Sequence, residues 1–214
     1  QNSKIISCGV GEDISFEIEL INKFNCKVIL VDPTPRSIDH YQKIINNLGK
    51  KKTSNYALKA NQKISSYNLE NIKNKNLNLI KKAIYIRNND VLNFFAPKNL
   101  KNVSYSLLVN ENINKKDFIS VKTITIDEII NKYKIVNLSL IKLDIEGMAS
   151  KIIEDLIDKR IFPQQICFEL DELNYLDYKK FIRILNLKKK LQDNNYDLVS
   201  TTDKMNFIFL NRNI

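Results

Sequence analysis

The chain has 214 residues, of which 43% are hydrophobic and 27% charged, which is typical of a globular protein with a sizeable core. It has no apolar run of about 18 residues, so no membrane span is expected. Its start lacks the pattern of a secretory signal peptide, so cytoplasm is the expected location. Cys8, Cys26 and Cys167 are scattered without CxxC spacing, so neither a zinc site nor a disulfide framework is expected.

The formal net charge of +10 is concentrated in the middle of the chain. Residues 41–134 hold 18 Lys and Arg residues against six Asp and Glu residues. A basic segment is typical of proteins that bind nucleic acid. However, Lys, Asn and Ile are abundant throughout, and no dense Arg cluster with interleaved aromatic residues occurs. A solvated Lys-rich surface is therefore the favoured interpretation, and RNA binding is the alternative.

The first fifty residues alternate between apolar runs, which predict buried strands, and amphipathic stretches, which predict helices. The expected elements, strand and helix in turn, are 4–8, 12–24, 27–32 and 33–49. Thr34 is expected to cap the second helix, with Pro35 at its first position and Gly49 just beyond its end. This alternation predicts the beginning of a parallel α/β sheet.

The rest of the chain continues this alternation after a polar segment, 50–76, that is interpreted as an exposed helix or loop. Further strands are expected at 77–86, 90–97, 121–126, 138–144, 165–170, 196–201 and 206–211, and further helices at 127–133, 147–159 and 176–194. Asp127 is the expected cap of its helix. The last two strands are joined by so few residues that they must be antiparallel. We expect a single domain over 1–214, with an inserted β-hairpin or loop around 87–126.

Two glycines, Gly9 and Gly11, lie between the first strand and the first helix, where they suit a ligand that approaches the backbone closely. Asp32 ends the next strand, where an acidic residue suits ribose hydroxyls. Nicotinamide dinucleotides and S-adenosylmethionine share this arrangement. The dinucleotide fingerprint has a third glycine, which is Ile14 here.

The two residues after Gly11, Glu12 and Asp13, add negative charge where a dinucleotide would place its pyrophosphate. S-adenosylmethionine has no phosphate and carries a sulfonium and an amine, both cationic. The acidic turn and the C-terminal hairpin therefore favour S-adenosylmethionine over a dinucleotide.

Six segments, in order along nearly the whole chain, resemble the FkbM-type family of S-adenosylmethionine-dependent methyltransferases. They are SCGVGEDISFE, VDPTPRSI, KKAIYIRNNDVLNFFAPKNLKNVSYSL, TITIDEII, IKLDIEG and QICFELDE. The resemblance implies an α/β class I methyltransferase fold: a mostly parallel, Rossmann-like seven-stranded sheet with a C-terminal antiparallel hairpin and helices on both faces. It also implies methyl transfer to oxygen on a sugar, a glycan or another small molecule, with S-adenosylhomocysteine as the product.

The resemblance also implies which residues form the site. The cofactor-binding residues would be Ser7, Gly9, Gly11, Asp13, Asp32, Pro33, Lys82, Ala83 and Lys142. The first four would lie near the methionine part, Asp32 at the ribose, and Lys82 and Ala83 near the adenine. Two departures from the family pattern stand out: Ser7 replaces a common acid, which weakens an expected contact with the cofactor's ammonium group, and Ala149 replaces a common glutamate.

The catalytic candidates are Asp144 and Glu146, which share a face if the strand geometry continues past its end. Two carboxylates on one face can raise one pKa and create a general base, or they can hold a divalent metal. Glu169 and Asp171 can join such a site or simply cap loops, so no metal site is assigned. The only histidine, His40, is expected on the surface of a helix.

Two other functions remain open from the sequence. One is an RNA methyltransferase that uses the basic segment 41–134 as its phosphate track. The other is a cofactor-binding homologue without catalysis, because Ser7 and Ala149 depart from the family pattern.

Overall fold

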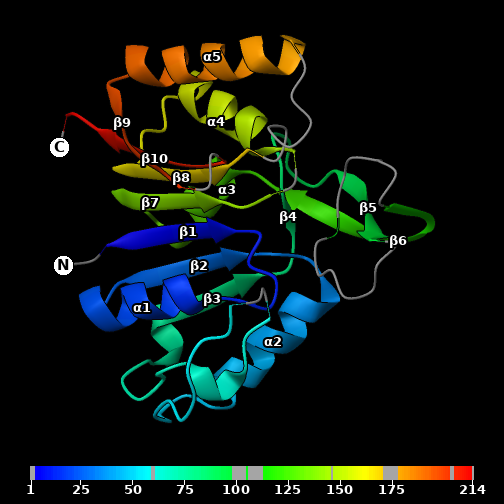
Figure 1. Ribbon diagram of the computed structural model, residues 1–214, viewed down its shortest axis with the longest axis vertical. Helices are drawn as coiled ribbons and strands as arrows, with labels where there is room; N and C mark the ends of the chain where they lie inside the picture. Colours follow the sequence, from blue (N-terminus) through cyan, green and yellow to red (C-terminus); the bar gives the residue numbers. More distant parts are fainter. Residues whose placement is uncertain are drawn as a thin grey trace.

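The computed structural model describes residues 3–58, 61–97, 105, 113–145, 147–170, 178–202 and 205–213. A seven-stranded sheet with the order β3-β2-β1-β7-β8-β10-β9 forms its centre (Figure 1). These strands are β1 Lys4–Cys8, β2 Lys27–Val31, β3 Leu77–Ile80, β7 Leu138–Leu143, β8 Gln165–Glu169, β9 Tyr196–Thr202 and β10 Asn206–Asn211. The helices are α1 Ser15–Phe24, α2 Pro35–Ile45, α3 Ile126–Tyr133, α4 Ala149–Asp158 and α5 Tyr178–Asp193.

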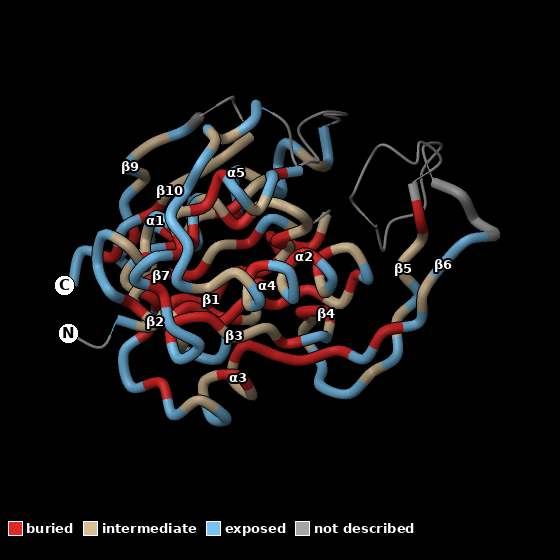
Figure 2. Tube along the Cα trace, turned by 90° about the horizontal axis from the view of Figure 1, so that it is seen from below, coloured by how far each residue is buried: buried red, intermediate tan, exposed pale blue. Residues whose placement is uncertain are grey.

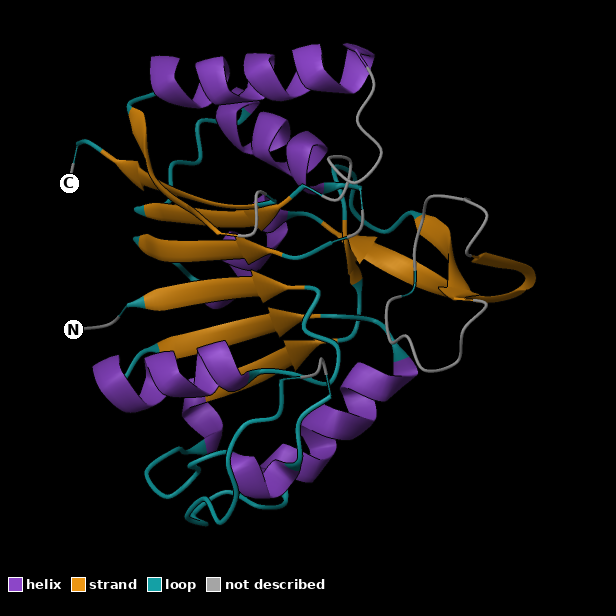
Figure 3. Cartoon of the chain, in the orientation of Figure 1, coloured by secondary structure: helices purple, strands orange, loops and turns teal. Residues whose placement is uncertain are grey.

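The strand directions confirm the predicted fold class. β3, β2, β1, β7 and β8 run parallel, while β10 is antiparallel to both β8 and β9. Helix α1 covers one face of the sheet and α3 the other (Figure 3). All the parallel strands point away from the two chain ends, so their carboxyl ends share one edge (Figure 1). In such open α/β sheets, ligands bind at that edge.

The central strands are buried on both faces, which explains why they read as continuous apolar runs. Along β1, Ile5 packs into the cluster under α1, whereas Ile6 and Cys8 pack into the cluster under α3 and α4. Ser7 is also fully buried. Figure 2 shows the buried residues concentrated along these strands. None of the described helices is both long and apolar enough to cross a lipid bilayer.

A second, three-stranded sheet lies beyond the carboxyl ends of the main strands (Figure 1). It consists of β4 Ala83–Ile84, β6 Ile113–Ile124 and β5 Val91–Pro97, with β5 and β6 antiparallel. The prediction of a single strand over 77–86 is therefore wrong. The chain leaves the main sheet after Ile80, and β4 pairs with β6 instead.

Several predicted helix ends differ from the structure. The helix expected over 12–24 begins only at Ser15, since the residues before it form the glycine turn. Thr34 and Pro35 stand where expected, but the Thr34 hydroxyl makes no capping hydrogen bond, and the helix ends at Ile45, before Gly49. For α3 the capping side chain is that of Thr125, whose hydroxyl accepts from Glu128 N, and not that of Asp127.

The polar segment 50–76 is less exposed than expected. It contains two short 3₁₀ helices, η1 Ile64–Ser66 and η2 Asn74–Asn76. Its apolar residues Tyr67, Leu69 and Ile72 are buried in the cluster under α1. Sparse apolar residues in a polar segment give no periodicity, so the sequence pattern does not show that they are core residues.

Candidate functional site

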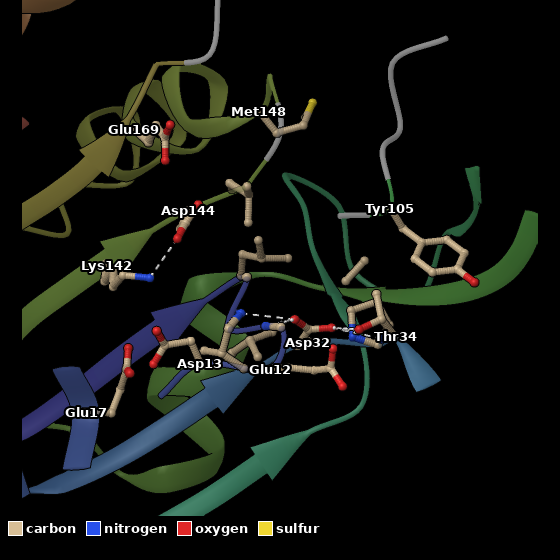
Figure 4. Close-up of a pocket in the computed structure, with 18 of the residues that line it drawn as sticks. Glu12, Asp13, Glu17, Asp32, Thr34, Tyr105, Lys142, Asp144, Met148 and Glu169 are labelled. Atoms are coloured by element: carbon tan, nitrogen blue, oxygen red, sulfur yellow. Dashed lines mark hydrogen bonds and ion pairs between the residues drawn. The ribbon is translucent and has the colours of Figure 1, made fainter. Parts of the chain in front are cut away.

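A cavity of about 480 Å³ opens at the shared edge of the parallel strands, a size within the range of small-molecule sites. Its lining comes from the turns after β1 and β2, the start of α1, the ends of β7 and β8, and the small sheet (Figure 4). The lining residues are Gly9, Val10, Gly11, Glu12, Asp13, Ser15, Phe16, Glu17, Val31, Asp32, Pro33, Thr34, Ala83, Ile84, Phe94, Tyr105, Lys142, Asp144, Ile145, Met148 and Glu169.

The glycine at position 9 is required by the neighbouring strand as well as by its own conformation. Its φ of +75° lies in the left-handed region that favours glycine. A Cβ built there would lie 1.8 Å from the backbone oxygen of Asp144. The backbone N–H of Asp144 donates to Cys8 O at 3.0 Å. This hydrogen bond between the ends of β1 and β7 keeps Gly9 close to the backbone of Asp144.

The carboxylate of Asp32 organises both turns at the edge of the cavity. Its Oδ2 accepts from the backbone N–H groups of Val10 and Gly11 at 3.0 Å each. Its Oδ1 accepts from Thr34 N at 2.8 Å and from Thr34 Oγ1 at 2.7 Å. A carboxylate has about four acceptor sites, so these contacts occupy all of them. Asp32 therefore ties the glycine turn to the start of α2.

The two acids after Gly11 hold the turn before α1, and Asp13 covers the amino end of that helix. Asp13 Oδ1 accepts from Ser15 N at 2.8 Å, at the amino end of α1, and its Oδ2 accepts from Gln62 at 3.0 Å. Glu12 forms a 2.5 Å ion pair with Arg36 on α2. Helix amino ends bind phosphate through free N–H groups. Here a carboxylate of the chain itself covers that end.

A group of charged residues lies on the side of the cavity next to β7. Lys142 Nζ donates to Asp144 Oδ2 at 3.0 Å (Figure 4). Ser7 Oγ donates to Glu17 Oε1 at 2.5 Å, with both residues buried. Burial by itself lowers the pKa of the Lys142 ammonium, but the carboxylates of Glu17 and Asp144 outweigh it and raise that pKa. Lys142 is therefore a cation throughout the physiological range.

The structure brings together most of the residues predicted for the site. Those that line the cavity are Gly9, Gly11, Asp13, Asp32, Pro33, Ala83, Lys142, Asp144 and Glu169. Two predicted residues do not line the cavity. Ser7 is buried and donates its hydroxyl to Glu17. Lys82 lies on the surface, where its Nζ donates to Asn89 Oδ1 at 3.0 Å. Glu146 and Asp171 lie outside the described residues. Among the described residues, no group of three His, Cys, Asp or Glu side chains is arranged to hold a metal ion.

Several lining residues were not predicted from the sequence. Glu17 is one: it lies in the first turn of α1 between Phe16 and Ile18, and this position between two apolar residues was the available signal. Phe94 and Tyr105 are others, contributed by the segment that carries the small sheet. No local pattern marks these two aromatic residues, because only the chain path brings them over the cavity.

His40 is not on the surface, so that prediction is wrong. It is buried on α2, and its Nε2 lies 2.8 Å from Tyr67 Oη. The Tyr67 oxygen already accepts from Ile14 N at 3.2 Å, so its proton is free to be donated to an unprotonated Nε2. Burial lowers the pKa of the His40 imidazole and outweighs the attraction of nearby Glu12 and Asp13. His40 therefore supports the turn before α1 as a neutral acceptor.

We expect this buried histidine to make the protein less stable as the pH falls below about 6.5, the pKa of an unfolded histidine. Below that pH the unfolded chain binds a proton that the folded chain, with its lowered His40 pKa, does not. The free energy of unfolding should fall by at most about 1.4 kcal/mol per pH unit over this window. Urea unfolding at pH 5 to 8 measures the slope.

The control for this experiment is His40→Gln. Because His40 is the only histidine, the free energy of unfolding of the variant should no longer change with pH between pH 5.5 and 7. An equal slope in both proteins would show that His40 is not the group that titrates.

The charge of the cavity is opposite to that of the whole chain. Six described lining residues are acidic, namely Glu12, Asp13, Glu17, Asp32, Asp144 and Glu169. Lys142 is the one basic residue among the described lining residues. A cavity of this kind attracts cations and repels phosphates.

Comparison with known protein families gives one match. A family profile described as the methyltransferase FkbM domain matches residues 7–198. A search of curated proteins found no match.

Similar solved structures include the fibrillarin pre-rRNA processing protein of Methanococcus jannaschii, with 12% identity and a TM-score of 0.45. The match covers 98% of this chain and 66% of that one. Monomeric WbdD has 10% identity and a TM-score of 0.47, with coverage of 99% and 37%. The methyltransferase domain of bacterial CtHen1-CN has 11% identity and a TM-score of 0.44, with coverage of 97% and 90%. The chain thus spans just under two thirds of the first of these proteins and about a third of the second.

The profile match covers most of the chain and includes the glycine turn, the Asp32 segment and the end of β7. It confirms the resemblance stated from the six sequence segments. The chain belongs to the methyltransferase FkbM domain family.

Proposed function

We propose that this protein is an S-adenosylmethionine-dependent methyltransferase that methylates a hydroxyl oxygen of a sugar, a glycan or another small molecule. The observation that carries the proposal is the acidic cavity beside the glycine turn, in a chain whose net charge is +10. Such a cavity suits a cationic cofactor without phosphate. When bound, S-adenosylmethionine supplies an electrophilic methyl group.

The lining residues fit this cofactor in size and chemistry. Gly9 and Gly11 offer backbone without side chains at the floor, and Ala83 and Ile84 offer a small apolar surface suited to adenine. Asp32 is proposed to meet the ribose. Its Oδ1 now accepts from the Thr34 hydroxyl, which can rotate and give way to a ribose hydroxyl.

Asp144 is proposed to remove the proton of the acceptor hydroxyl. Its side chain is 49% exposed at the cavity and is held by Lys142 through Oδ2. A positioned base contributes about 10²- to 10⁴-fold to such a reaction, and alignment of the reactants contributes about 7–11 kcal/mol. Glu146 stays a proposed catalytic residue, as the family resemblance implies.

The acceptor is proposed to enter from the side of the small sheet. Phe94 and Tyr105 line the cavity there. Aromatic rings of this kind pack well against the apolar faces of small ring compounds. Such a wall fits a sugar ring better than it fits a phosphate backbone.

Calorimetric titration with S-adenosylmethionine, S-adenosylhomocysteine and NAD⁺ tests the cofactor. We expect both sulfur compounds to bind and NAD⁺ to give no heat, because its pyrophosphate would meet Glu12 and Asp13. Binding of NAD⁺ alone, or of none of the three, would refute the proposal.

We expect Asp144→Asn to lower methyl transfer by about 10²- to 10⁴-fold while the affinity for S-adenosylmethionine stays within about threefold. Transfer is measured as labelled methyl reaching a panel of hydroxylated sugars and glycans, with RNA as a second panel. Asp39→Asn, on the exposed face of α2, is the matched control. Full transfer by Asp144→Asn would remove Asp144 from the mechanism, and salt-sensitive labelling of RNA alone would favour the RNA alternative.

A further inference from the structure

The first glycine motif of this chain lacks its usual acid, yet a carboxylate is present at the same place. Ser7 occupies the position where the family pattern often has an acid. Its hydroxyl donates to Glu17 Oε1 at 2.5 Å, and both side chains are almost fully buried. Glu17 reaches this point from the first turn of α1, so the helix brings a carboxylate to the end of the strand.

Glu17 is more than a structural partner of Ser7, because it also lines the cavity. A buried carboxylate is unfavourable unless other groups compensate its charge. The Ser7 hydroxyl is the one hydrogen-bond donor that the described residues show for it, and it reaches only Oε1. Figure 4 shows Glu17 on the side of the cavity where Asp13 and Lys142 also lie. The second oxygen is therefore available to a ligand.

We infer that Glu17 is the carboxylate that receives the α-ammonium group of S-adenosylmethionine, in place of the acid missing at Ser7. This inference rests on the proposed function, and it adds a binding residue that the glycine motif itself does not contain. Glu17 and Lys142 then act as a pair: the carboxylate binds the amine, and the nearby ammonium of Lys142 limits the negative charge of the empty site.

The test is calorimetric binding of three related compounds to wild type and Glu17→Gln. S-adenosylmethionine and S-adenosylhomocysteine both carry the ammonium group, while 5′-methylthioadenosine lacks the whole amino-acid part. We expect Glu17→Gln to weaken the first two by about 10-fold or more and to leave the third unchanged, since a hydrogen bond between charged groups is lost. Thermal unfolding without ligand checks that the variant is folded.

Two further variants separate binding from structure. Glu19→Gln, at an exposed residue of the same helix, keeps the Glu17 carboxylate and should retain the affinity for S-adenosylmethionine within about threefold. The exchange Ser7→Asp with Glu17→Gln returns the carboxylate to the strand and should recover most of the lost affinity.

Three results would overturn the inference. Equal affinity of wild type and Glu17→Gln for S-adenosylhomocysteine would show that Glu17 does not contact the ammonium group. Equal weakening of all three compounds would show a structural role only. If wild type binds neither S-adenosylmethionine nor S-adenosylhomocysteine, the proposed function itself fails, and the inference fails with it.

Discussion

Gly9→Ala is expected to lower the free energy of unfolding by about 3 kcal/mol or more, which corresponds to roughly 6–12 °C in the melting temperature of a chain of this size. Two effects combine. An alanine at φ +75° is strained by about 1–2 kcal/mol. Its methyl group would also lie 1.8 Å from Asp144 O, a backbone atom in the sheet that cannot turn aside.

The control for this prediction is Gly49→Ala. Gly49 has φ +87°, but a Cβ there would meet nothing within 4 Å. It therefore shares the backbone strain of Gly9 without the clash, and its loss should be only about 1–2 kcal/mol. Thermal and urea unfolding of the two variants measure the difference. Equal losses would mean that the approach of β1 to β7 does not restrict position 9.

Asp32→Ala is expected to lower the free energy of unfolding by about 3–5 kcal/mol and to abolish detectable binding of S-adenosylmethionine. The substitution leaves the N–H groups of Val10, Gly11 and Thr34 without their acceptor. A buried donor left unpaired costs about 1–3 kcal/mol. Urea unfolding measures the first effect and calorimetric titration the second.

Asp39→Ala is the matched control for this second substitution. Asp39 is an exposed carboxylate on α2 that forms only a surface pair with Lys43 among the described residues. Its loss should stay within about 0.5 kcal/mol. If Asp32→Ala is as stable as Asp39→Ala but still loses the cofactor, Asp32 binds the ligand without organising the turns. If it loses stability but keeps the affinity, the ribose assignment is wrong.

The sequence predicted the alternating elements well because their signals are local. An apolar run between turn residues predicts a buried strand wherever it lies, as at β1, β2 and β8. The antiparallel direction of β9 and β10 followed from their short connection. The predictions failed where the chain's path decides the outcome: β4 leaves the main sheet, and Tyr67 enters the core from a polar segment.

The site residues divide in the same way, into those marked by a local sequence signal and those placed by the path of the chain. Gly9, Gly11, Asp32 and Asp144 were predicted from motifs, because a turn residue or strand end marks each of them in the sequence, and all four line the cavity. Lys82 lies just before β4 and donates to Asn89 at the surface, whereas the next residue, Ala83, lines the cavity. The direction of the Lys82 side chain depends on this contact with Asn89, which the motif does not encode.

The sequence by itself determined the kind of sheet, the place of the glycine turn and the acid that follows the second strand, since these depend on residues close together in the chain. Only the tertiary structure decided what those residues contact. Packing of β7 against β1 leaves no room for a Cβ at Gly9, and the winding of α1 sets Glu17 against Ser7. Burial under Tyr67 turns His40 into a neutral acceptor. Such contacts depend on how distant segments pack, which no local pattern encodes.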